Sequence, residues 1–511
     1  MKDSSKSSTL GRRDFLKRLG IGTTLSALPR FARAGGASAV ATKRPSNVIF
    51  ILADDIGYGD LGCYGATKVK TPNLDRLAAG GVRFTDAHSP SSMCTPTRVA
   101  VLTGEYAWRG ACPRGVLNGD AALIIKPGST TVPSLLKKAG YATGAVGKWH
   151  LGFGEKEKGP DYNGELKPGP LEVGFDYFFG YPATNDRVPC VYVENHRVVN
   201  LDPKDPISFS TKMPEGKRIE LAGHPRIGTM TGGKAALWKD EDMAAVFSGK
   251  AISFIEAHRD QPFFLYYCPR NIHVPITPNP RFRGTSQCGI RGDDIHELDW
   301  AVGELLKAVD RLDLAGNTLV IFTSDNGGTL QFVTDEENAG HKLNGDLRGN
   351  KGGLYEGGHR EPFIARWPER IKSGQVSKQM ICLIDLLATC AALTGTDLPA
   401  EAGPDSLNVL PALLDPLLAK PVRKDLVMHS GAGALAIREG DWKLIPKQDG
   451  GGKAQKTKQQ ATGRRPAGDE LYNLADDLGE QNNVYAQHPE IVKHLTELLE
   501  KYRSAGRSRG T

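Results

Sequence analysis

The sequence predicts an α/β protein with a large, mostly parallel central β-sheet flanked by helices, followed by a smaller C-terminal part. Apolar runs of strand length, rich in β-branched and aromatic residues, recur over the first 330 residues. Such near-continuous runs are typical of strands that are buried on both faces. Segments with helical periodicity lie between them, which is the alternation of an α/β protein. The 511 residues are enough for one large domain and a smaller one.

The first 34 residues are typical of an export signal rather than of a folded domain. Arg12 and Arg13 precede a short, weakly apolar run, and small residues follow at Ala32 and Ala34. This pattern predicts a twin-arginine signal peptide over residues 1–34, and hence a periplasmic or secreted protein that the twin-arginine machinery exports. A disordered basic tail is the alternative. The apolar run is too short and too polar for a membrane span.

Four predicted strands end in polar residues. They occupy residues 47–55, 141–150, 262–273 and 317–328. Helical patterns lie between these strands, at residues 73–80, 131–140, 241–258 and 293–311. The polar residues at the strand ends are Asp54, Asp55, Lys148, His150, His273, Asp325 and Asn326. Because ligands bind at the carboxyl ends of the strands in such sheets, we expect these side chains to form one site.

The rest of the chain is predicted to cover and follow that site. Residues 155–240 are rich in Gly and Pro and lack periodicity, which predicts loops and a small insertion over the site. The main domain is predicted to span residues 45–395. Residues 396–511 are then a C-terminal subdomain with a small antiparallel sheet and a closing helix at 489–503. The basic stretch 447–468 is predicted to be a mobile solvated loop, with glycan contact as the alternative.

Asp54, Asp55, Asp325 and Asn326 are candidate metal ligands. Side-chain oxygens without His or Cys suit Ca²⁺ or Mg²⁺ rather than zinc. A single Asp-Asp pair after a strand is more commonly a helix N-cap, but two such pairs after two strand-like runs favour a metal site. The net charge of +7 suits an anionic substrate, and the sequence contains no recognisable nucleic-acid-binding motif.

Cys94 lies just before a predicted short helix within "SSMCTPTRVAVLTG", residues 91–104. Pro96 suits the first turn, and Gly104 suits the end. A thiol at the positive end of a helix is expected to have a lowered pKa, although a buried, inert cysteine is the alternative. A thiolate is a soft ligand and a poor partner for a hard cation. Oxidation of the cysteine to an aldehyde, whose hydrate offers oxygens, removes this mismatch.

The segment around Cys94 resembles the formylglycine motif of the type I sulfatases, which belong to the alkaline phosphatase-like superfamily. "CTPTR" followed by "LTG" carries the resemblance, with "ILADDIGYGDLGCYG", "GYATGAVGKWHLG", "TSDNGG" and "RGNKGGLYEGGHREP" in the family's order. The C-terminal "REGDWKLI" and "ELYNLADDLGEQNNV" are similar to the family's smaller domain. Together the blocks span roughly residues 45–490. Thr97 stands where many members have Ser or Ala.

The resemblance implies the cofactors of the reaction. It implies one Ca²⁺, which would be bound by Asp54, Asp55, Asp325, Asn326 and the modified Cys94. It also implies that a maturation enzyme oxidises Cys94 to formylglycine. The implied activity is cleavage of sulfate monoesters by a formylglycine hydrate, the nucleophile.

The resemblance also implies the roles of five further residues. Arg98 would hold the hydrated aldehyde, and Lys148 and Lys351 would bind the sulfate oxygens of the substrate. His273 would lie by the leaving oxygen. His150 would take the proton whose loss collapses the sulfated hydrate.

Asn185, Asp186 and Arg187 are predicted to bind the alcohol part of the substrate. They are consecutive and polar, and two prolines flank them in the loop 180–199. An Asp or Arg there can read sugar hydroxyls, or a neighbouring carboxylate or sulfate. A solvated turn is the alternative. The loop favours a sulfated carbohydrate over a small aryl ester as the substrate.

Three other functions stay open from the sequence. A phosphonate monoester hydrolase or phosphodiesterase of the same superfamily is the first, although the additional His and Asp ligands of its two-metal members cannot be assembled here. The second is a protein that binds sulfated glycans without turnover. The third is a cysteine hydrolase with a Cys94 thiolate and a His base, which leaves the four oxygen ligands unexplained.

Overall fold

The computed structural model describes residues 46–212, 219–221, 224–330, 333–334, 336–447 and 468–510. The predicted signal peptide and nearly all of the basic stretch 447–468 lie outside the described residues. None of the helices in the described ranges combines the length and the apolar character needed to cross a membrane. All eight cysteines are free thiols.

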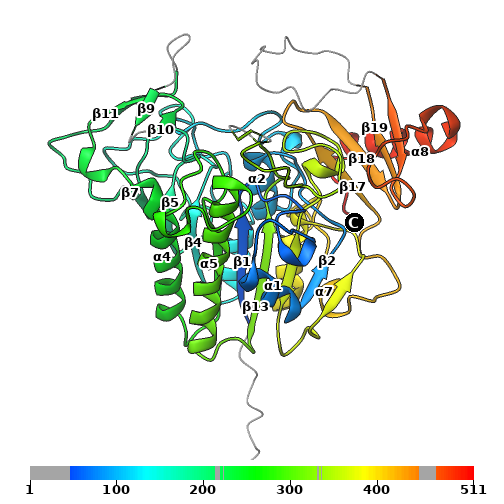
Figure 1. The fold of residues 1–511 in the computed structure, drawn as a ribbon, viewed down its shortest axis with the longest axis horizontal. Coiled ribbons are helices and arrows are strands. Elements are labelled where there is room, and N and C mark those ends of the chain that lie inside the picture. The colour runs from blue at the N-terminus through cyan, green and yellow to red at the C-terminus, as the bar shows by residue number, and fades with distance from the viewer. Residues whose placement is uncertain are drawn as a thin grey trace, which may run out of the picture. The chain divides into compact units, whose positions relative to one another are not determined.

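A ten-stranded sheet forms the centre of the fold (Figure 1). Its order is β15 (Gln375–Ser377), β2 (Val82–Phe84), β14 (Phe363–Arg366), β13 (Thr318–Ser324), β1 (Asn47–Ala53), β12 (Phe263–Cys268), β4 (Ala142–Lys148), β5 (Tyr177–Tyr181), β6 (Val193–Glu194) and β7 (Arg197–Val198). The strands β13, β1, β12, β4 and β5 run parallel to one another. Strands β14 and β6 flank them in the antiparallel sense. The predicted fold class is confirmed.

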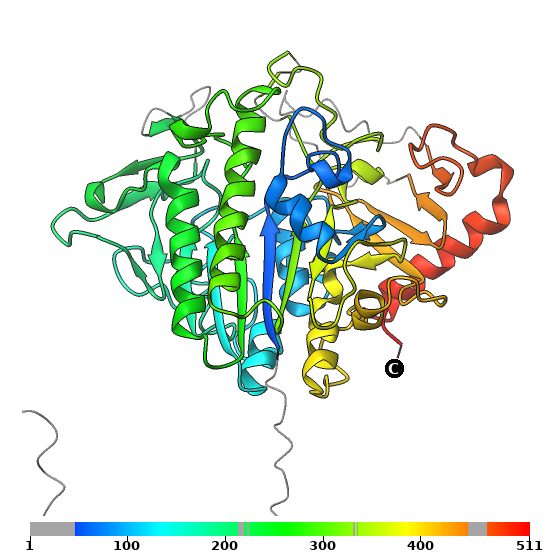
Figure 2. The ribbon, with the colours of Figure 1, turned by 60° about the horizontal axis from the view of Figure 1, so that its bottom comes forward.

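Helices cover both faces of this sheet because its strands are apolar on both sides. Along β1, Phe50 packs into one core and Ile51 packs into the other. The core that contains Ile51 is covered by α1 (Pro72–Ala79), α4 (Met243–Ala257) and α5 (Gly289–Arg311). Figure 2 shows α4 and α5 side by side, in green. The core that contains Phe50 is covered by α2 (Cys94–Thr103), α3 (Val132–Lys138), α6 (Leu386–Thr394) and α7 (Leu410–Leu414).

The interpretation of residues 155–240 as loops is wrong for β5. This strand pairs in parallel with β4 and extends the central sheet. Gly147 and Gly180 face each other there, and a Cβ atom on Gly180 would lie 1.9 Å from the Gly147 carbonyl oxygen. The close approach of the two backbones therefore requires glycine, the residue type that suggested a loop. The segment also contains β6 and β7 of the same sheet, together with the short paired strands β8 (Ser208–Ser210), β9 (Ile219–Leu221), β10 (His224–Arg226) and β11 (Thr229–Thr231).

The C-terminal part contains the predicted small antiparallel sheet. Its strands are β17 (Asp425–His429), β18 (Leu435–Glu439), β19 (Trp442–Ile445) and β20 (Glu470–Asn473). The closing helix α8 (Pro489–Ser504) packs on this sheet. Ala100 of α2 belongs to the same apolar cluster, whereas Val99 and Val101 belong to the core of the central sheet. Helix α2 is therefore held from both sides. The short strands β3 (Ala87–His88) and β16 (Ile381–Cys382) pair nearby.

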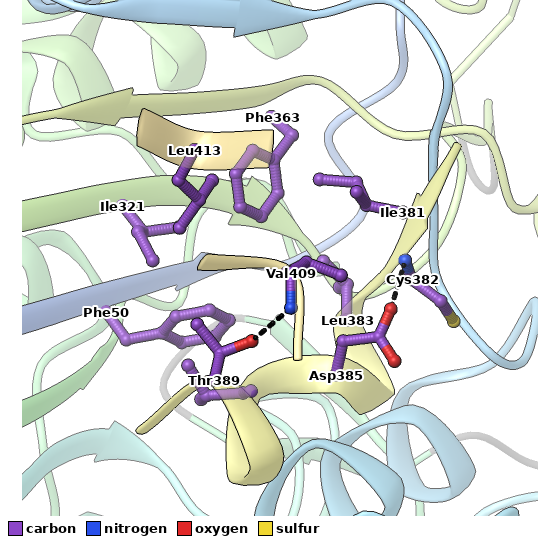
Figure 3. A pocket seen from close by; sticks show the side chains of 11 residues that line it. Phe50, Ile321, Phe363, Ile381, Cys382, Leu383, Asp385, Thr389, Val409 and Leu413 are labelled. Carbon is purple, nitrogen blue, oxygen red and sulfur yellow. Dashed lines mark hydrogen bonds between the residues drawn. The ribbon is translucent and has the colours of Figure 1, made fainter. Parts of the chain in front are cut away.

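A small, mostly apolar pocket lies between the central sheet and α6 (Figure 3). Its two polar side chains are used by the protein itself. Asp385 accepts a hydrogen bond from the backbone N–H of Cys382, and Thr389 accepts one from the N–H of Val409. The pocket therefore offers no free polar group to orient a ligand.

Candidate active site

The polar residues predicted from the four strand ends come together at one edge of the sheet. Asp54 and Asp55 follow β1, and Asp325 and Asn326 follow its neighbour β13. Lys148 is the last residue of β4, and His273 lies five residues beyond β12. The strands β13, β1, β12 and β4 are adjacent in the sheet, so parallel pairing alone gathers their ends. All these side chains are buried.

The three carboxylates and the Cys94 sulfur form a compact group of donors. Ligand atoms of Asp54, Asp55, Asp325 and Cys94 all lie within 4.8 Å of one another. The Asn326 Nδ2 donates to Asp55 Oδ1 at 2.8 Å, whereas its Oδ1 is buried without a hydrogen-bond partner among the described residues. An unpaired amide oxygen beside three buried carboxylates fits a hard, oxygen-binding cation such as Ca²⁺.

Three basic side chains balance these carboxylates. Lys148 Nζ lies 2.6 Å from Asp54 Oδ2, and Lys351 Nζ pairs with Asp55 Oδ1. Arg98 donates to Asp325 Oδ2 from Nε at 3.0 Å and from Nη2 at 2.7 Å. The Arg98 Nη1 is buried and has no partner in the described part of the chain. This donor is therefore available to a ligand.

The charges in this group stabilise one another. Burial alone would raise the pKa of Asp55, but Lys351 and His273 hold it well below its usual range. Burial alone would lower the pKa of Lys351, but Asp55 raises it above its usual range. Both side chains are therefore charged at neutral pH. Burial and the neighbouring Asp54 raise the pKa of Asp325, which is the electrostatic cost that a bound cation would relieve.

Cys94 is the first residue of α2 rather than the residue before it, and Gly104 ends this helix with a φ of 67°, as predicted. Its Sγ lies 3.7 Å from Asp54 Oδ1. The expectation of a lowered thiol pKa is wrong, because burial and the charge of Asp325 raise the pKa of Cys94 to about 12. Burial is the larger of these two effects. A thiolate nucleophile is therefore disfavoured, which argues against the cysteine hydrolase.

The two histidines of the site are held as neutral proton acceptors. His150 Nε2 lies 2.9 Å from the Leu117 carbonyl oxygen, so Nε2 carries the proton and the buried, unpartnered Nδ1 carries the lone pair. His273 Nδ1 lies 2.8 Å from the Val274 carbonyl oxygen, which leaves its lone pair on Nε2. Burial and Lys351 lower the pKa of His273 to about 4, and burial and Lys148 lower the pKa of His150.

Asn185 braces the loop that carries His273. Its Nδ2 donates to the carbonyl oxygens of His273 and Pro275, each at 3.2 Å. The side chain is fully buried, and its Oδ1 has no hydrogen-bond partner among the described residues. Asn185 therefore helps to fix the backbone position of His273.

Asp186 and Arg187 lie in the same loop, and their side chains form a hydrogen-bonded ion pair. Arg187 Nη1 donates to Asp186 Oδ1 at 3.0 Å, and its Nε donates to Asn118 Oδ1 at 3.1 Å. Burial alone would raise the pKa of Asp186, but the charge of Arg187 lowers it, with a smaller contribution from His273 when that ring is protonated. Asp186 is therefore close enough to the reaction centre to interact with it electrostatically.

Tyr181 is a site residue that the sequence analysis missed. It ends β5, and it pairs in register with Lys148 of β4. Its side chain is fully buried, and its hydroxyl has no hydrogen-bond partner in the described ranges. Burial and the charge of Asp54 raise its pKa, which places the phenol near the carboxylate cluster. The aromatic run "YFFGY" (177–181) was the available signal for this strand.

Known proteins resemble this chain in sequence and in fold over most of its length. An N-acetylgalactosamine-6-O-sulfatase of Bacteroides thetaiotaomicron is 45% identical over 483 residues, which cover 90% of this chain and 93% of the relative. Human arylsulfatase A is 36% identical over 487 residues, which cover 92% of this chain and 90% of the relative. A solved structure from work on the metabolism of multiple glycosaminoglycans by B. thetaiotaomicron superposes with a TM-score of 0.85 at 44% identity, and the match covers 90% of this chain and 100% of that chain.

The family comparison settles the class of enzyme. The sulfatase family model matches residues 46–396, which include Cys94, both pairs of strand-end ligands and Lys351. The relatives named above are themselves sulfatases and match over most of the chain. The chain therefore belongs to the sulfatase family of the alkaline phosphatase-like superfamily and is an enzyme that hydrolyses sulfate esters.

Proposed function

We propose that the protein removes sulfate from sulfated carbohydrates, with 6-O-sulfated N-acetylgalactosamine units of glycosaminoglycans as the leading substrate class. The observation that carries the reaction is the buried group of Asp54, Asp55, Asp325 and Cys94, whose donor atoms lie within 4.8 Å of one another beside three cations. The substrate class follows from the relative that acts on N-acetylgalactosamine-6-O-sulfate and matches 90% of this chain.

We propose Ca²⁺ and formylglycine as the cofactors. Asp54, Asp55, Asp325, Asn326 and the oxidised residue 94 would hold the ion, and the unpaired Asn326 Oδ1 supports this ligand set. When bound, the cation offsets the negative charge of the sulfate group, and the hydrated aldehyde supplies the attacking oxygen. A formylglycine-generating enzyme is then a required partner.

The cations of the site bind and orient the sulfate ester. Arg98 offers the unpaired Nη1 to an oxygen at residue 94, since its Nε and Nη2 are held by Asp325. Lys148 forms an ion pair with Asp54, and Lys351 forms one with Asp55. From these positions both ammonium groups would contact the sulfate oxygens. Fixed positive charges in a buried site stabilise the charge that develops as the S–O bond breaks.

Proton transfer is divided between two sides of the site. His150 presents a lone pair on Nδ1, so it can accept the proton from the hydroxyl of residue 94. On the other side the leaving alkoxide needs a proton. Lys351 is the protonated group there, because its pKa is raised, whereas His273 is neutral with a pKa of about 4. We therefore assign proton donation to Lys351 and positioning of the leaving oxygen to His273.

A direct comparison of substrates tests this function. The matured enzyme is expected to hydrolyse an aryl sulfate with a higher kcat/KM than the matched aryl phosphate or phosphonate. Within a panel of defined sulfated sugars, 6-O-sulfated N-acetylgalactosamine is expected to react fastest. A preference for the phosphonate would establish the alternative hydrolase, and binding of the sulfated sugars without turnover would establish a glycan-binding protein.

Asp186 and Arg187 are proposed to select the sugar. Because the neighbouring Asn185 donates to the His273 backbone carbonyl, Asp186 is placed on the side of the leaving oxygen, where the alcohol must be. Asn185 is proposed to act indirectly, through the backbone of His273. Replacing Asp186 and Arg187 together with alanine is expected to lower kcat/KM for the cognate sulfated sugar by about tenfold or more. Hydrolysis of an aryl sulfate should change little, and equal losses on both substrates would contradict the assignment.

We also propose the cellular context that the sequence predicts. The segment 1–34 would direct the folded protein through the twin-arginine machinery to the periplasm or out of the cell. The sulfatase catalytic domain would span residues 45–395, and the C-terminal subdomain would span residues 396–511.

A further inference from the structure

A second buried cluster of charged side chains lies outside the proposed catalytic residues. Its carboxylates are Asp86, Glu356 and Glu480, and its cations are Arg360, Arg438 and Lys443. The two histidines His88 and His359 lie among them, with their Nδ1 atoms 3.0 Å apart. Arg438 and Lys443 belong to β18 and β19 of the C-terminal sheet, so the cluster joins the C-terminal part to the segment that follows Lys351.

The cluster already contains its cation. Ligand atoms of His88, Glu356 and His359 lie within 4.8 Å of one another, as in a metal site. However, the fully buried Lys443 Nζ lies 2.9 Å from Glu356 Oε1, 2.8 Å from Glu480 Oε1 and 3.1 Å from His359 Nε2. The three carboxylates are matched in number by the three basic side chains. Two of the three candidate ligands, Glu356 and His359, are therefore already paired with the ammonium group of Lys443.

Lys443 holds the segment that carries Lys351. Glu356, its partner, lies five residues after Lys351 and begins the single-turn 3₁₀ helix Glu356–Gly358. The backbone N–H of Glu356 also donates to Glu480 at 2.6 Å, so both the side chain and the backbone of this residue are fixed by the C-terminal part. Arg360 adds a bond to Glu356 Oε2 at 2.8 Å.

The segment 349–358 transmits this constraint because it folds tightly on itself. A Cβ atom on Gly357 would lie 2.4 Å from the Gly349 carbonyl oxygen, so the two ends of the segment touch. Gly327, which directly follows the candidate ligand Asn326, donates its N–H to the Gly358 carbonyl oxygen at 3.0 Å. The backbone N–H of Lys351 donates to Gly328 at 3.3 Å. A shift of Glu356 therefore moves Lys351 relative to Asp55.

We propose that Lys443 is a positioning residue for Lys351: from the C-terminal sheet it fixes Glu356, and through the segment 349–358 it sets the place of the Lys351 ammonium group. This inference rests on the proposed role of Lys351 at the sulfate group. It gives the C-terminal sheet a part in the reaction although none of its side chains belongs to the proposed catalytic set.

Lys443→Met tests the proposal, because it removes the charge and keeps the length of the side chain. In the full-length, matured, calcium-loaded enzyme, kcat on an aryl sulfate is expected to fall by about tenfold or more, since small displacements of a catalytic group are costly. Amide hydrogen exchange in segment 349–361 is expected to accelerate. If Lys443→Met does not fold, Glu356→Gln removes the same ion pair with little change of shape and carries the same expectations.

Arg423→Met is the matched control. Arg423 is also buried, and it pairs with Asp385 at 2.9 Å; its other hydrogen bonds go to the backbone carbonyls of Asp405 and Asp425, outside the segment 349–361. This variant is expected to lose stability but to keep the kcat and the hydrogen exchange of that segment, at a temperature where both variants are folded. A loss of kcat in Arg423→Met equal to that in Lys443→Met would contradict a specific positioning role.

A double-mutant cycle with Lys351→Ala separates positioning from general damage. If Lys443 acts through Lys351, adding Lys443→Met to Lys351→Ala is expected to lower kcat no further. An equal loss in both backgrounds, or unchanged exchange in segment 349–361, would overturn the proposal. The exchange measurement does not depend on turnover, so it decides the positioning claim even if the wild-type protein hydrolyses no sulfate ester, a result that would reject the proposed function instead.

Discussion

Replacing Cys94 with alanine is expected to lower kcat/KM for an aryl sulfate by about ten-thousandfold or more, because alanine cannot be oxidised to the aldehyde whose hydrate is the nucleophile. The fold should tolerate the change. Cys94 is the first residue of α2, and among the described residues its Sγ makes just one long side-chain hydrogen bond, to Asp54 Oδ1 at 3.7 Å. The measurement is steady-state hydrolysis after coexpression with a maturation enzyme, beside the melting temperature of each protein.

Cys390→Ala is the control for this variant. Cys390 is also a buried free thiol, but it lies in α6 within the apolar core and not in the site. It is expected to cost some stability through the small cavity that remains and to keep full activity. If Cys94→Ala retained activity within tenfold of the wild type, residue 94 would not be the nucleophile.

The second large effect concerns Asp325. Asp325→Asn is expected to lower calcium affinity and kcat/KM together, each by about a hundredfold or more, because it removes one charge from the ligand group and keeps the volume. Asparagine is preferable to alanine here. Asp325 accepts two hydrogen bonds from the buried Arg98, and removing that partner entirely would leave an unpaired buried charge, at a cost of about 3–5 kcal/mol.

Calcium content by elemental analysis and a calcium titration of the activity measure this effect. Asp385→Asn is the control, since Asp385 pairs with the buried Arg423 in the same way and belongs to no candidate ligand group among the described residues. It should weaken the fold but leave calcium binding intact. Lost activity with unchanged calcium affinity in Asp325→Asn would assign Asp325 to another role.

The site could be predicted from the sequence because parallel strands gather their ends without help from other contacts. Asp54 and Asp325 are 271 residues apart, yet each directly follows a strongly apolar strand. Once the two strands pair, as β1 and β13 do, the side chains must meet. The same argument explains why Lys148 arrives at the site from β4.

The parts that could not be predicted depend on contacts between two segments whose sequences contain no signal that they will meet. Strand β5 was missed because its pairing with β4 needs Gly180, a residue that also signals loops. Substrate binding by Asn185 stays a prediction, but a polar residue in a loop does not reveal that its amide will bond to the His273 backbone. The pKa of Cys94 was expected to fall because the helix dipole is local, whereas the opposing charge of Asp325 comes from a distant strand.

The link between the C-terminal sheet and the site could not be predicted from the sequence either. Lys443 lies in the motif "REGDWKLI", which the sequence analysis assigned to the smaller domain. Only the folded structure brings its ammonium group against Glu356, 87 residues earlier in the chain. A buried lysine in a short strand has no periodic signature that distinguishes it from an exposed one.

The oxidation state of residue 94 is the most direct test of the account. Trypsin releases residue 94 in the peptide 84–98, because Arg83 and Arg98 bound a segment without other basic cleavage sites. In an active preparation, mass spectrometry is expected to find this peptide about 18 Da lighter than the thiol form, since oxidation to the aldehyde replaces sulfur by oxygen and removes two hydrogens. The fraction converted should rise in proportion to the specific activity. A fully active enzyme whose peptide carries an intact thiol would contradict the account.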